Sequence, residues 1–391
     1  MYDVAAGLVQ AGHHVTMLAI NTPKHHQPAD AMQHLGPHFR LVTVDVNTDL
    51  SPLMALRNLL LSGQPYNVER FISPQVEAKL LELLGTNAFD VIQLEGTFTA
   101  WYAGFLTEAR ANGKIAAHLV PPVVLRAHNV EFSIWQMLAS RTGNPAKRWY
   151  LRNMATRLEE FEKWMLHRVT AVAAITEDDA RRLRLMGCPA PVVFIPAGAN
   201  LSRLQADPTI QPRPRTLFML GSLNWLPNQV GVEWLLREVW PTFHAEFPEV
   251  ELHIAGSGAP AHLLAARTDN VFMHGFVASA PDFMQQYELM LVPLLSGGGM
   301  RVKIIEGLAL GKAILSTTLG AEGIAVRDGH DILLRDGAAA WLTALRVWAR
   351  GEVPLASLGA AAARTATELY DNRRVVARFE ELYQGLQPGR A

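Results

Sequence analysis

Short runs of valine, isoleucine, leucine and alanine alternate along the chain with amphipathic helical segments, and this alternation most limits the fold. Most of the apolar runs are continuous, as in a parallel sheet that helices cover on both faces. A repeated order of strand and helix predicts doubly wound α/β domains. The expected strands span 15–20, 40–44, 90–94, 123–126, 171–175, 192–195, 217–220, 250–255, 271–273, 289–293, 313–316 and 331–334.

A proline-rich segment, 205–215, separates these strands into two groups of six. It contains three prolines and few apolar side chains, which is typical of a linker. We expect an N-terminal domain over 1–204, a second domain over 216–370 and a terminal helical segment over 371–391. The expected fold class is therefore α/β, with two Rossmann-like doubly wound domains facing a cleft. Ligands of such domains bind beyond the carboxyl ends of the strands.

The first expected element is a helix, 3–11, whereas a doubly wound domain ordinarily begins with its central strand. Gly12 suits the position after this helix, and the first expected strand follows it. The N-terminal sheet should then have a gap through its middle. We expect that the natural protein begins upstream of Met1 and that the first strand is missing here. An in-frame stop codon directly before Met1 would contradict this expectation.

Composition excludes several function classes. Of the 391 residues, 49% are hydrophobic and 18% are charged, which excludes a disordered chain. The net charge of −1 shows no excess of basic residues of the kind that a nucleic-acid-binding protein carries. The single cysteine, Cys188, excludes a disulfide framework and a multi-cysteine metal site, and it fits a reducing compartment. No apolar run approaches the ~20 residues of a membrane span, and the first residues are not expected to form a signal peptide.

The most informative segment is 293–311, PLLSGGGMRVKIIEGLALG. Three glycines, 297–299, follow a strand and precede a helix, so backbone amides and the helix N-terminus can face an anion. Arg301 and Lys303 add positive charge where cations alone are unfavourable, which makes sense if a diphosphate binds there. Glu306, one turn on, suits ribose hydroxyls. The alternative interpretation is a glycine-rich turn with a surface ion pair between Lys303 and Glu306.

Two further segments end strands of the second domain. In 219–229, MLGSLNWLPNQ, Ser222 precedes Asn228, a predicted helix N-cap, and the alternative is a packed loop anchored by Trp225. The segment 254–261, IAGSGAPA, has the spacing of a dinucleotide fingerprint. No acidic residue ends the next strand to hold a ribose, so a tight turn is favoured.

The first domain offers His128 and Glu131 in LRAHNVE and Glu95 in QLEGT, each after a predicted strand. His128 could bind a ligand or move a proton, and the alternative is a structural histidine. Glu95 could instead be a turn carboxylate. Basic and aromatic residues of 147–164 could lie on an anionic membrane surface, although a solvated helix face is favoured because three glutamates dilute the charge.

Taken together, the chain resembles the retaining glycosyltransferases of family 4, which have the two-Rossmann-domain (GT-B) fold. The resemblance covers the whole chain, and its longest landmark is VPLLSGGGMRVKIIEGLALGKAILSTTLGAEGI. Weaker landmarks are GLVQAGHHVTMLA, RAHNVE, AAITEDDA, FIPAGAN, LGSLNWLPN and HIAGSG.

The resemblance implies that the C-terminal domain binds a nucleotide-sugar donor and the N-terminal domain an acceptor, with the last helix crossing back. It also implies that the reaction needs neither a metal ion nor a cofactor. Glu306 would hold the ribose, and the backbone of 297–299 would face the sugar and phosphates. His128 would contact the donor sugar, and Gly275, Phe276 and Val277 would lie near the base. From the residues themselves we expect Arg301 and Lys303 to be the other catalytic residues. Positions after predicted strands also place Ser222 and Asn228 on the donor side, and Glu95 and Glu131 on the acceptor side.

Two departures from the family pattern stand out. The family commonly has two glutamates separated by seven residues; the second corresponds to Glu306, but Gly298 stands in place of the first. The phosphate-binding Arg and Lys of the family usually follow the first strand of the C-terminal domain. Here the loop 221–228 has neither, and we expect Arg301 and Lys303 to supply the charge from the opposite side of the phosphates.

The expected function is therefore transfer of a sugar from a nucleotide-sugar to an acceptor hydroxyl with retention, in cell-envelope polysaccharide or glycolipid assembly. The expected location is cytoplasmic or peripheral on the inner face of the cell membrane. One alternative is a nucleotide-sugar 2-epimerase, which would need carboxylates around the sugar, where Gly298 stands. Another is a non-catalytic or truncated homologue, and a nicotinamide oxidoreductase is the most distant.

Overall fold

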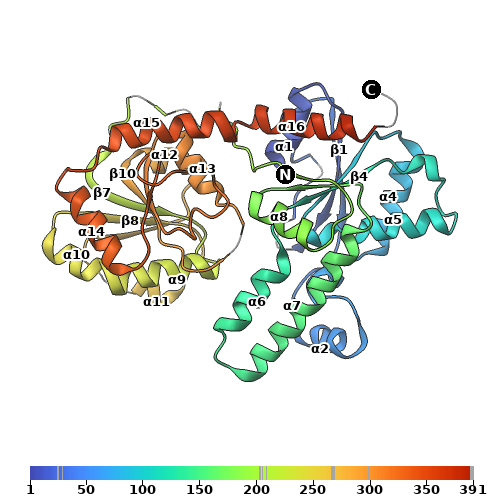
Figure 1. The fold of residues 1–391 in the computed structure, drawn as a ribbon, viewed down its shortest axis with the longest axis horizontal. Coiled ribbons are helices and arrows are strands. Elements are labelled where there is room, and N and C mark those ends of the chain that lie inside the picture. Colours follow the sequence, from blue (N-terminus) through green and yellow to red (C-terminus); the bar gives the residue numbers. More distant parts are fainter. Residues whose placement is uncertain are drawn as a thin grey trace. The chain divides into compact units, whose positions relative to one another are not determined.

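The structure is a computed structural model that describes residues 1–23, 26–28, 30–201, 204, 206–207, 209–265, 269–297 and 299–387. It divides into two compact units (Figure 1). Unit 1 comprises Met1–Pro196 and the segment from Val375 onward, and unit 2 comprises Ala197–Arg374. The terminal helix thus begins in unit 2 and continues in unit 1. The expected linker differs from the structure, because unit 2 begins before it and its first strand begins within it, at Arg213.

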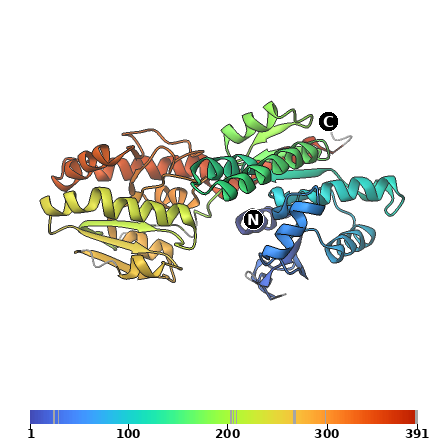
Figure 2. The same ribbon diagram turned by 90° about the horizontal axis from the view of Figure 1, so that it is seen from below.

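Unit 1 alternates strands and helices, with α6 and α7 side by side as a helical hairpin (Figures 1 and 2). Its strands are β1 (Val15–Asn21), β2 (Phe39–Asp45), β3 (Ile92–Glu95), β4 (Val123–Ala127), β5 (Ala171–Ala174) and β6 (Val192–Phe194). Its helices are α1 (Tyr2–Gln10), α2 (Pro52–Leu61), α3 (Tyr66–Glu69), α4 (Pro74–Thr86), α5 (Trp101–Ala111), α6 (Glu131–Arg141), α7 (Pro145–Leu166), α8 (Glu177–Leu185) and most of α16 (Asn372–Gly385).

The strands of unit 1 form two parallel sheets rather than one. β1 pairs with β2, and β3, β4, β5 and β6 pair in that order. Among the described residues no strand joins β1 to β3, so the expected interruption of the N-terminal sheet is present. The inner strands β4 and β5 are buried along their whole length, which explains their continuous apolar sequences.

Two helices from opposite ends of the chain share one face of the four-stranded sheet. Val4 of α1 and Phe379 of α16 pack in one cluster with Val124 and Ala171 of the sheet. The guanidinium of Arg126 lies 4.7 Å above the Phe379 ring and donates to the carbonyl of Pro196. α16 therefore completes the apolar cover of unit 1.

Unit 2 is one six-stranded parallel sheet in the order β12-β11-β10-β7-β8-β9. Its strands are β7 (Arg213–Leu220), β8 (Glu251–Ala255), β9 (Val271–Gly275), β10 (Tyr287–Val292), β11 (Ala313–Ser316) and β12 (Leu333–Leu334). Its helices are α9 (Leu226–Trp234), α10 (Trp240–Glu246), α11 (Ala261–Ala265), α12 (Ala280–Gln285), α13 (Val302–Ala309), α14 (Ala338–Ala349) and α15 (Leu355–Thr365). A π-helical turn (Leu235–Val239) joins α9 to α10, and another (Ala366–Tyr370) follows α15.

The strand order of unit 2 reverses at β7. The chain goes outward from β7 through β8 to β9, and then returns to the other side of β7 with β10. Such a switch point leaves a crevice at the carboxyl ends of the two central strands, and ligands of doubly wound sheets bind there. The loops that follow β7 and β10 are therefore the first place to look for a site.

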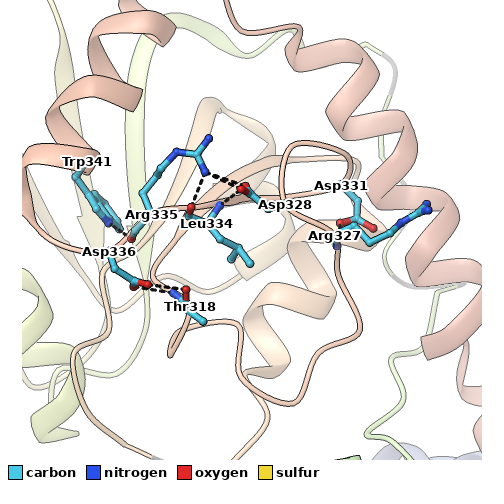
Figure 3. Close-up of polar contacts among 8 residues, drawn as sticks. All are labelled: Thr318, Arg327, Asp328, Asp331, Leu334, Arg335, Asp336 and Trp341. Carbon is cyan, nitrogen blue, oxygen red and sulfur yellow. Dashed lines mark hydrogen bonds and ion pairs between the residues drawn. The ribbon is translucent and has the colours of Figure 1, made fainter.

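The segment after β11 is held by carboxylates (Figure 3). Asp336 accepts hydrogen bonds from the backbone amide and hydroxyl of Thr318, at 3.0 and 2.6 Å. Asp328 accepts from the amide of Leu334 and from Arg335. These carboxylates are engaged in fixing the loop, which packs the next strand, β12, against β11. No helix among the described residues is long and apolar enough to cross a membrane.

Candidate functional site

Lys303 of α13 reaches the loop that follows β7. Its Nζ donates to Oδ1 of Asn228 at 3.1 Å, although the two residues are 75 positions apart. Gly221, with a φ of +159°, makes this approach possible, because a Cβ there would lie 3.1 Å from Nζ and 2.8 Å from Nδ2 of Asn228. The lysine thus places its charge beside the loop that follows the carboxyl end of β7.

The ammonium group of Lys303 is held in an unfavourable environment. Burial is the larger cause and the nearby charge of Arg301 the smaller one, and together they lower the pKa of Lys303 to about 7. An anion bound between the two cations would offset both effects, because it favours the charged forms. The pair is therefore a candidate for binding a phosphate.

Arg301 is the N-cap residue of α13, one position before the first helical residue. It is 6% exposed, and its guanidinium lies 5.3 Å above the ring of Trp225 and donates to the carbonyl of Gly299. Burial lowers the pKa of Arg301, while the charge of Glu322 raises it. Because α13 has its N-terminus here, the helix dipole adds to this positive potential.

The glycine-rich loop before α13 is tightly packed. Gly297 has a φ of +108°, and a Cβ there would lie 3.0 Å from the ring of Trp225 and 3.3 Å from Arg301. Gly299 also has a positive φ, of +80°. A side chain at Gly297 would therefore be strained and crowded, so glycine is required where the loop passes Trp225. Gly298 lies outside the described residues.

The prediction for Asn228 is wrong in one respect. It is not the N-cap of α9, which begins at Leu226 after Trp225; it lies in the first turn and is 5% exposed. Its Nδ2 donates back to the carbonyl of Ser222 at 2.8 Å, while Oδ1 accepts from Lys303. Asn228 therefore joins the loop after β7 to the cation from α13.

The remaining donor-side predictions lie on neighbouring elements of unit 2. Gly275 ends β9 with a φ of +66°, Phe276 is 78% exposed and Val277 is half-buried. Glu306 lies on α13 and is half-buried. Gly256 closes the turn after β8, where its amide donates to the carbonyl of Gly275 at 2.7 Å. The dinucleotide-like spacing is thus a tight turn, as the sequence favours.

In unit 1, the structure brings His128 and Glu95 into contact. The Nε2 atom of His128 lies 2.9 Å from Oε2 of Glu95, and Gln93 donates to the other oxygen at 2.5 Å. Burial raises the pKa of Glu95, but the hydrogen bond with His128 and the charge of Arg126 outweigh it and leave that pKa below its ordinary value. Glu95 is therefore a carboxylate that holds the imidazole of His128, whose side chain is 40% exposed.

Glu131 begins α6, and its carboxylate accepts from Asn129 at 2.9 Å and from Trp135. Burial raises the pKa of Glu131. The backbone amides of Glu131 and Phe132 both donate to Glu162 of α7, at 2.9 and 3.0 Å. Sequence reasoning missed this role of Glu162, because no local pattern indicates that a carboxylate late in α7 stabilises the start of α6.

The segment 147–164 lies on α7 and has one solvated face, as the sequence favours, but one of the three glutamates expected on that face is buried. Glu162 is 0% exposed, and Trp164 is stacked on Phe161 and Trp101. Lys147 and Trp149 are exposed in the N-terminal part of α7, and Glu160 and Lys163 are exposed in its C-terminal part. Among the described residues, no group of three or more histidine, cysteine, aspartate or glutamate side chains could hold a metal ion.

Two family comparisons match this arrangement of two units. Residues 1–198 match the family described as glycosyl transferase 4-like domain, and residues 214–349 match glycosyl transferases group 1. The first match alone covers half of the chain. The chain belongs to the glycosyl transferase 4-like family. The expected family resemblance is therefore confirmed.

Curated relatives of this family member share about a quarter of their residues with it. It is 26% identical over 160 residues to phosphatidyl-myo-inositol mannosyltransferase of Mycolicibacterium smegmatis, and 25% identical over 217 residues to that of Mycobacterium leprae. These matches cover 39% and 53% of the chain. They span 41% and 57% of the two relatives, so about half of their length is matched.

Solved structures confirm the GT-B fold for this glycosyl transferase 4-like chain. Sucrose-phosphate synthase from Thermosynechococcus elongatus superimposes with a TM-score of 0.69 at 17% identity, covering 98% of the chain and 91% of that protein. A trehalose-6-phosphate synthase gives 0.66 at 12% identity, with 99% and 96% covered. Anabaena HepE in complex with UDP-glucose gives 0.62 at 13% identity, with 98% and 94% covered. At these identities the similarity concerns the fold.

Proposed function

We propose that this protein is a metal-independent glycosyltransferase that takes a sugar from a nucleotide-sugar donor and needs no cofactor. Unit 2 binds the donor, with the diphosphate at Arg301, Lys303 and the start of α13. The observation that carries the proposal is the 3.1 Å contact from Lys303 to Asn228, because it places a half-buried cation at the switch point between β7 and β10. Family membership and a fold shared with a UDP-glucose complex of HepE support it.

The proposed reaction proceeds with retention. The bond between the anomeric carbon of the sugar and the diphosphate oxygen breaks, and its electron pair leaves with the diphosphate. The oxygen of an acceptor hydroxyl bonds to the anomeric carbon from the same face, and its proton goes to the leaving phosphate. Arg301 and Lys303 stabilise the negative charge that develops on the phosphate. Retention is supported by the family resemblance and by a neighbour studied for transfer with retention.

Other residues have supporting roles in this proposal. Glu306 binds the ribose hydroxyls, the loop at Gly275–Val277 lies near the base, and the backbone at Gly297 and Gly299 faces the sugar. His128 takes part at the donor sugar, and Glu95 holds its ring through the 2.9 Å contact. Glu131 belongs to the acceptor side of unit 1.

The acceptor in this proposal is a saccharide or a lipid-linked saccharide of the cell envelope, and the enzyme works in the cytoplasm at the inner face of the membrane. The relatives named phosphatidyl-myo-inositol mannosyltransferase support a lipid-linked acceptor. A sugar that is attached to a lipid presents its hydroxyl at a membrane surface, so a peripheral enzyme would meet it there.

Calorimetric titration with UDP, GDP, ADP and NAD tests the donor site. We expect one nucleoside diphosphate to bind, and the variant Arg301→Ala/Lys303→Ala to lose that binding. Arg237→Ala is the matched control, because Arg237 is an exposed cation of unit 2 that pairs with its neighbour Glu238. Binding of NAD alone, or equal binding by the double variant, would overturn the proposal. Product analysis without an acceptor then separates transfer from 2-epimerisation.

A further inference from the structure

Helix α2 of unit 1 exposes four of its five leucines and buries its asparagine. Leu53, Leu56, Leu60 and Leu61 are 74%, 52%, 71% and 81% exposed, whereas Asn58 is 2% exposed. These leucines follow one another at helical spacing, so they form a continuous apolar stripe, here called the leucine face. Soluble domains rarely expose several large apolar side chains together unless a partner covers them. The leucine face is therefore a candidate interaction surface.

Polar contacts hold α2 with this face outward. Nδ2 of Asn58 donates to the carbonyl of Gln64 at 2.9 Å and to Oε2 of Glu69 at 2.7 Å. Arg157 of α7 donates to Oδ1 of Asn58 at 3.3 Å and to the carbonyl of Leu59 at 2.9 Å. Rotating the helix to bury its leucines would break these bonds and leave buried polar groups without partners. The outward orientation is thus built into unit 1.

The same contacts bring α2 to a basic part of the hairpin α6–α7, and Figure 1 shows these helices at one end of unit 1. The sequence 132–158 contains five basic residues and no aspartate or glutamate, and 50–68 contains only Arg57 as a charged residue. Lys147 and Arg152 are exposed on α7, and Trp149 is 59% exposed. Trp149 lies eight residues before the residue that contacts α2, which is about 12 Å along a helix.

We propose that the leucine face and the exposed N-terminal part of α7 together bind the surface of an anionic lipid bilayer. The leucines enter the boundary between headgroups and acyl chains, and Lys147, Arg152 and Arg57 face lipid phosphates. Trp149 suits the headgroup level, where tryptophan is enriched. A lipid surface is favoured as the occupant because exposed leucines occur together with exposed basic residues, while the segments 50–68 and 132–158 contain no aspartate or glutamate. The inference does not require transferase activity.

Vesicle flotation tests this surface with the full chain and no sugar donor. The wild type should float with vesicles of phosphatidylcholine containing 30% phosphatidylglycerol and remain unbound with phosphatidylcholine alone. Lys147→Ala/Arg152→Ala should weaken binding about 20-fold, since each basic residue near an anionic surface contributes on the order of fivefold. Lys114→Ala/Arg110→Ala is the matched charge control, because both residues are exposed elsewhere on unit 1.

The leucines are tested by Leu53→Ser/Leu56→Ser/Leu60→Ser, which should lower vesicle binding at least about 100-fold because three apolar side chains lose their insertion. Leu185→Ser is the control, since Leu185 is 80% exposed on α8. Equal flotation of the triple variant, or no flotation of the wild type, would overturn the proposal. So would a triple variant that changes the oligomeric state but not vesicle binding, because the face would then join copies of the chain.

A second measurement locates the contact without changing the leucine face as a whole. Cys188 is the single cysteine, so Cys188→Ser/Leu61→Cys can be labelled with one environment-sensitive fluorophore. Its emission should rise and shift to the blue on adding anionic vesicles, whereas a label at Cys188→Ser/Leu185→Cys should not respond. The reverse pattern would place the membrane contact elsewhere. Since no donor is present, failure here is separate from failure of the proposed transferase function.

Discussion

The imidazole Nε2 of His128 lies 2.9 Å from the carboxylate Oε2 of Glu95, and the two residues end the neighbouring strands β4 and β3. Glu95 ends β3 itself, and His128 directly follows the last residue of β4. Because parallel strands present their carboxyl ends at the same edge, two residues 33 positions apart become one unit. The carboxylate fixes the orientation of a half-exposed imidazole.

This contact makes Glu95 a positioning residue for His128. In the proposed reaction, His128→Ala should lower kcat about 100-fold, and Glu95→Gln about tenfold with little change in KM. The double variant should lose no more than His128→Ala alone, because Glu95 acts through the ring. His118→Ala, an exposed histidine of unit 1, is the control. Additive losses in the double variant would show that Glu95 acts independently.

Arg301→Ala should lower turnover on the order of 100-fold, as removal of one group that stabilises developing charge typically does. The reason is that its guanidinium lies at the start of α13, next to the glycine-rich loop. Steady-state kinetics with the donor found by calorimetry provides the measurement, and Arg237→Ala should leave turnover unchanged. Unchanged turnover in Arg301→Ala would refute the role assigned to this residue.

Lys303 predicts a pH dependence of donor binding. Its pKa of about 7 in the free protein means that the ammonium loses its proton above pH 7. A bound diphosphate favours the charged form, so binding must restore the proton at higher pH. Affinity should therefore fall between pH 7.5 and 9 by up to about tenfold per pH unit.

Calorimetry in buffers of different ionisation enthalpy should show uptake of about one proton per diphosphate at pH 8. The phosphate has already lost its last proton in this range, since its second pKa is about 6. Lys303→Met should bind more weakly and without proton uptake. A wild-type affinity that does not change from pH 7.5 to 9 would contradict the placement of Lys303 at the diphosphate.

Glu162 predicts a stability that decreases as pH rises. Burial raises its pKa to about 7 in the folded state, against an ordinary value of 4.5, although two backbone amides oppose the rise. The folded state thus holds this proton more tightly than the unfolded state. The free energy of unfolding should fall between about pH 4.5 and 7, by at most about 3 kcal/mol.

Urea unfolding of the wild type and of Glu162→Gln at several pH values measures this contribution. The glutamine cannot ionise, so the variant should gain stability relative to the wild type as pH rises through this range. Glu160→Gln is the matched control, since Glu160 is an exposed residue of the same helix. A constant difference between Glu162→Gln and the wild type would show that Glu162 keeps its ordinary pKa.

Gly256 joins the turns after β7 and β8. A Cβ at Gly256 would lie 1.9 Å from the carbonyl oxygen of Gly221, and its φ is +154°. Gly256→Ala should therefore destabilise unit 2 by about 2–4 kcal/mol, whereas Gly329→Ala, with a positive φ but open space, should cost about 1 kcal/mol. Thermal unfolding measures both, and equal losses would show that backbone conformation alone matters.

Local patterns predicted most of the architecture. Each expected strand corresponds to one strand of the structure, and the expected helix 3–11 corresponds to α1. Continuous apolar runs and turn residues act over a few positions, so they can be recognised without knowing the fold. Helix α2 was not predicted, although a serine followed by a proline, here Ser51 and Pro52, is a signal for the start of a helix. In the structure, the hydroxyl of Ser51 accepts a hydrogen bond from the amide of Met54 and so caps the helix.

The sequence predicted the individual residues of the candidate site but not the contacts between them. The glycine-rich loop, Arg301 and Lys303 were recognised from the residues before a helix, and His128 and Glu95 from their positions after strands. The role of Asn228 was wrong, because its side chain bonds to Ser222 rather than capping α9. Such bonds depend on the path of a loop, which spacing along the chain does not determine.

The sequence by itself determined the α/β class, the division into two groups of strands and the presence of cations beside a glycine-rich turn. Only the tertiary structure decided that Lys303 reaches Asn228, that Glu162 faces the amides at the start of α6, and that α2 turns its leucines outward. The physical reason is that helix and strand patterns arise from neighbouring residues. Which side chains meet, and which face stays uncovered, depends on segments brought together from far apart in the chain.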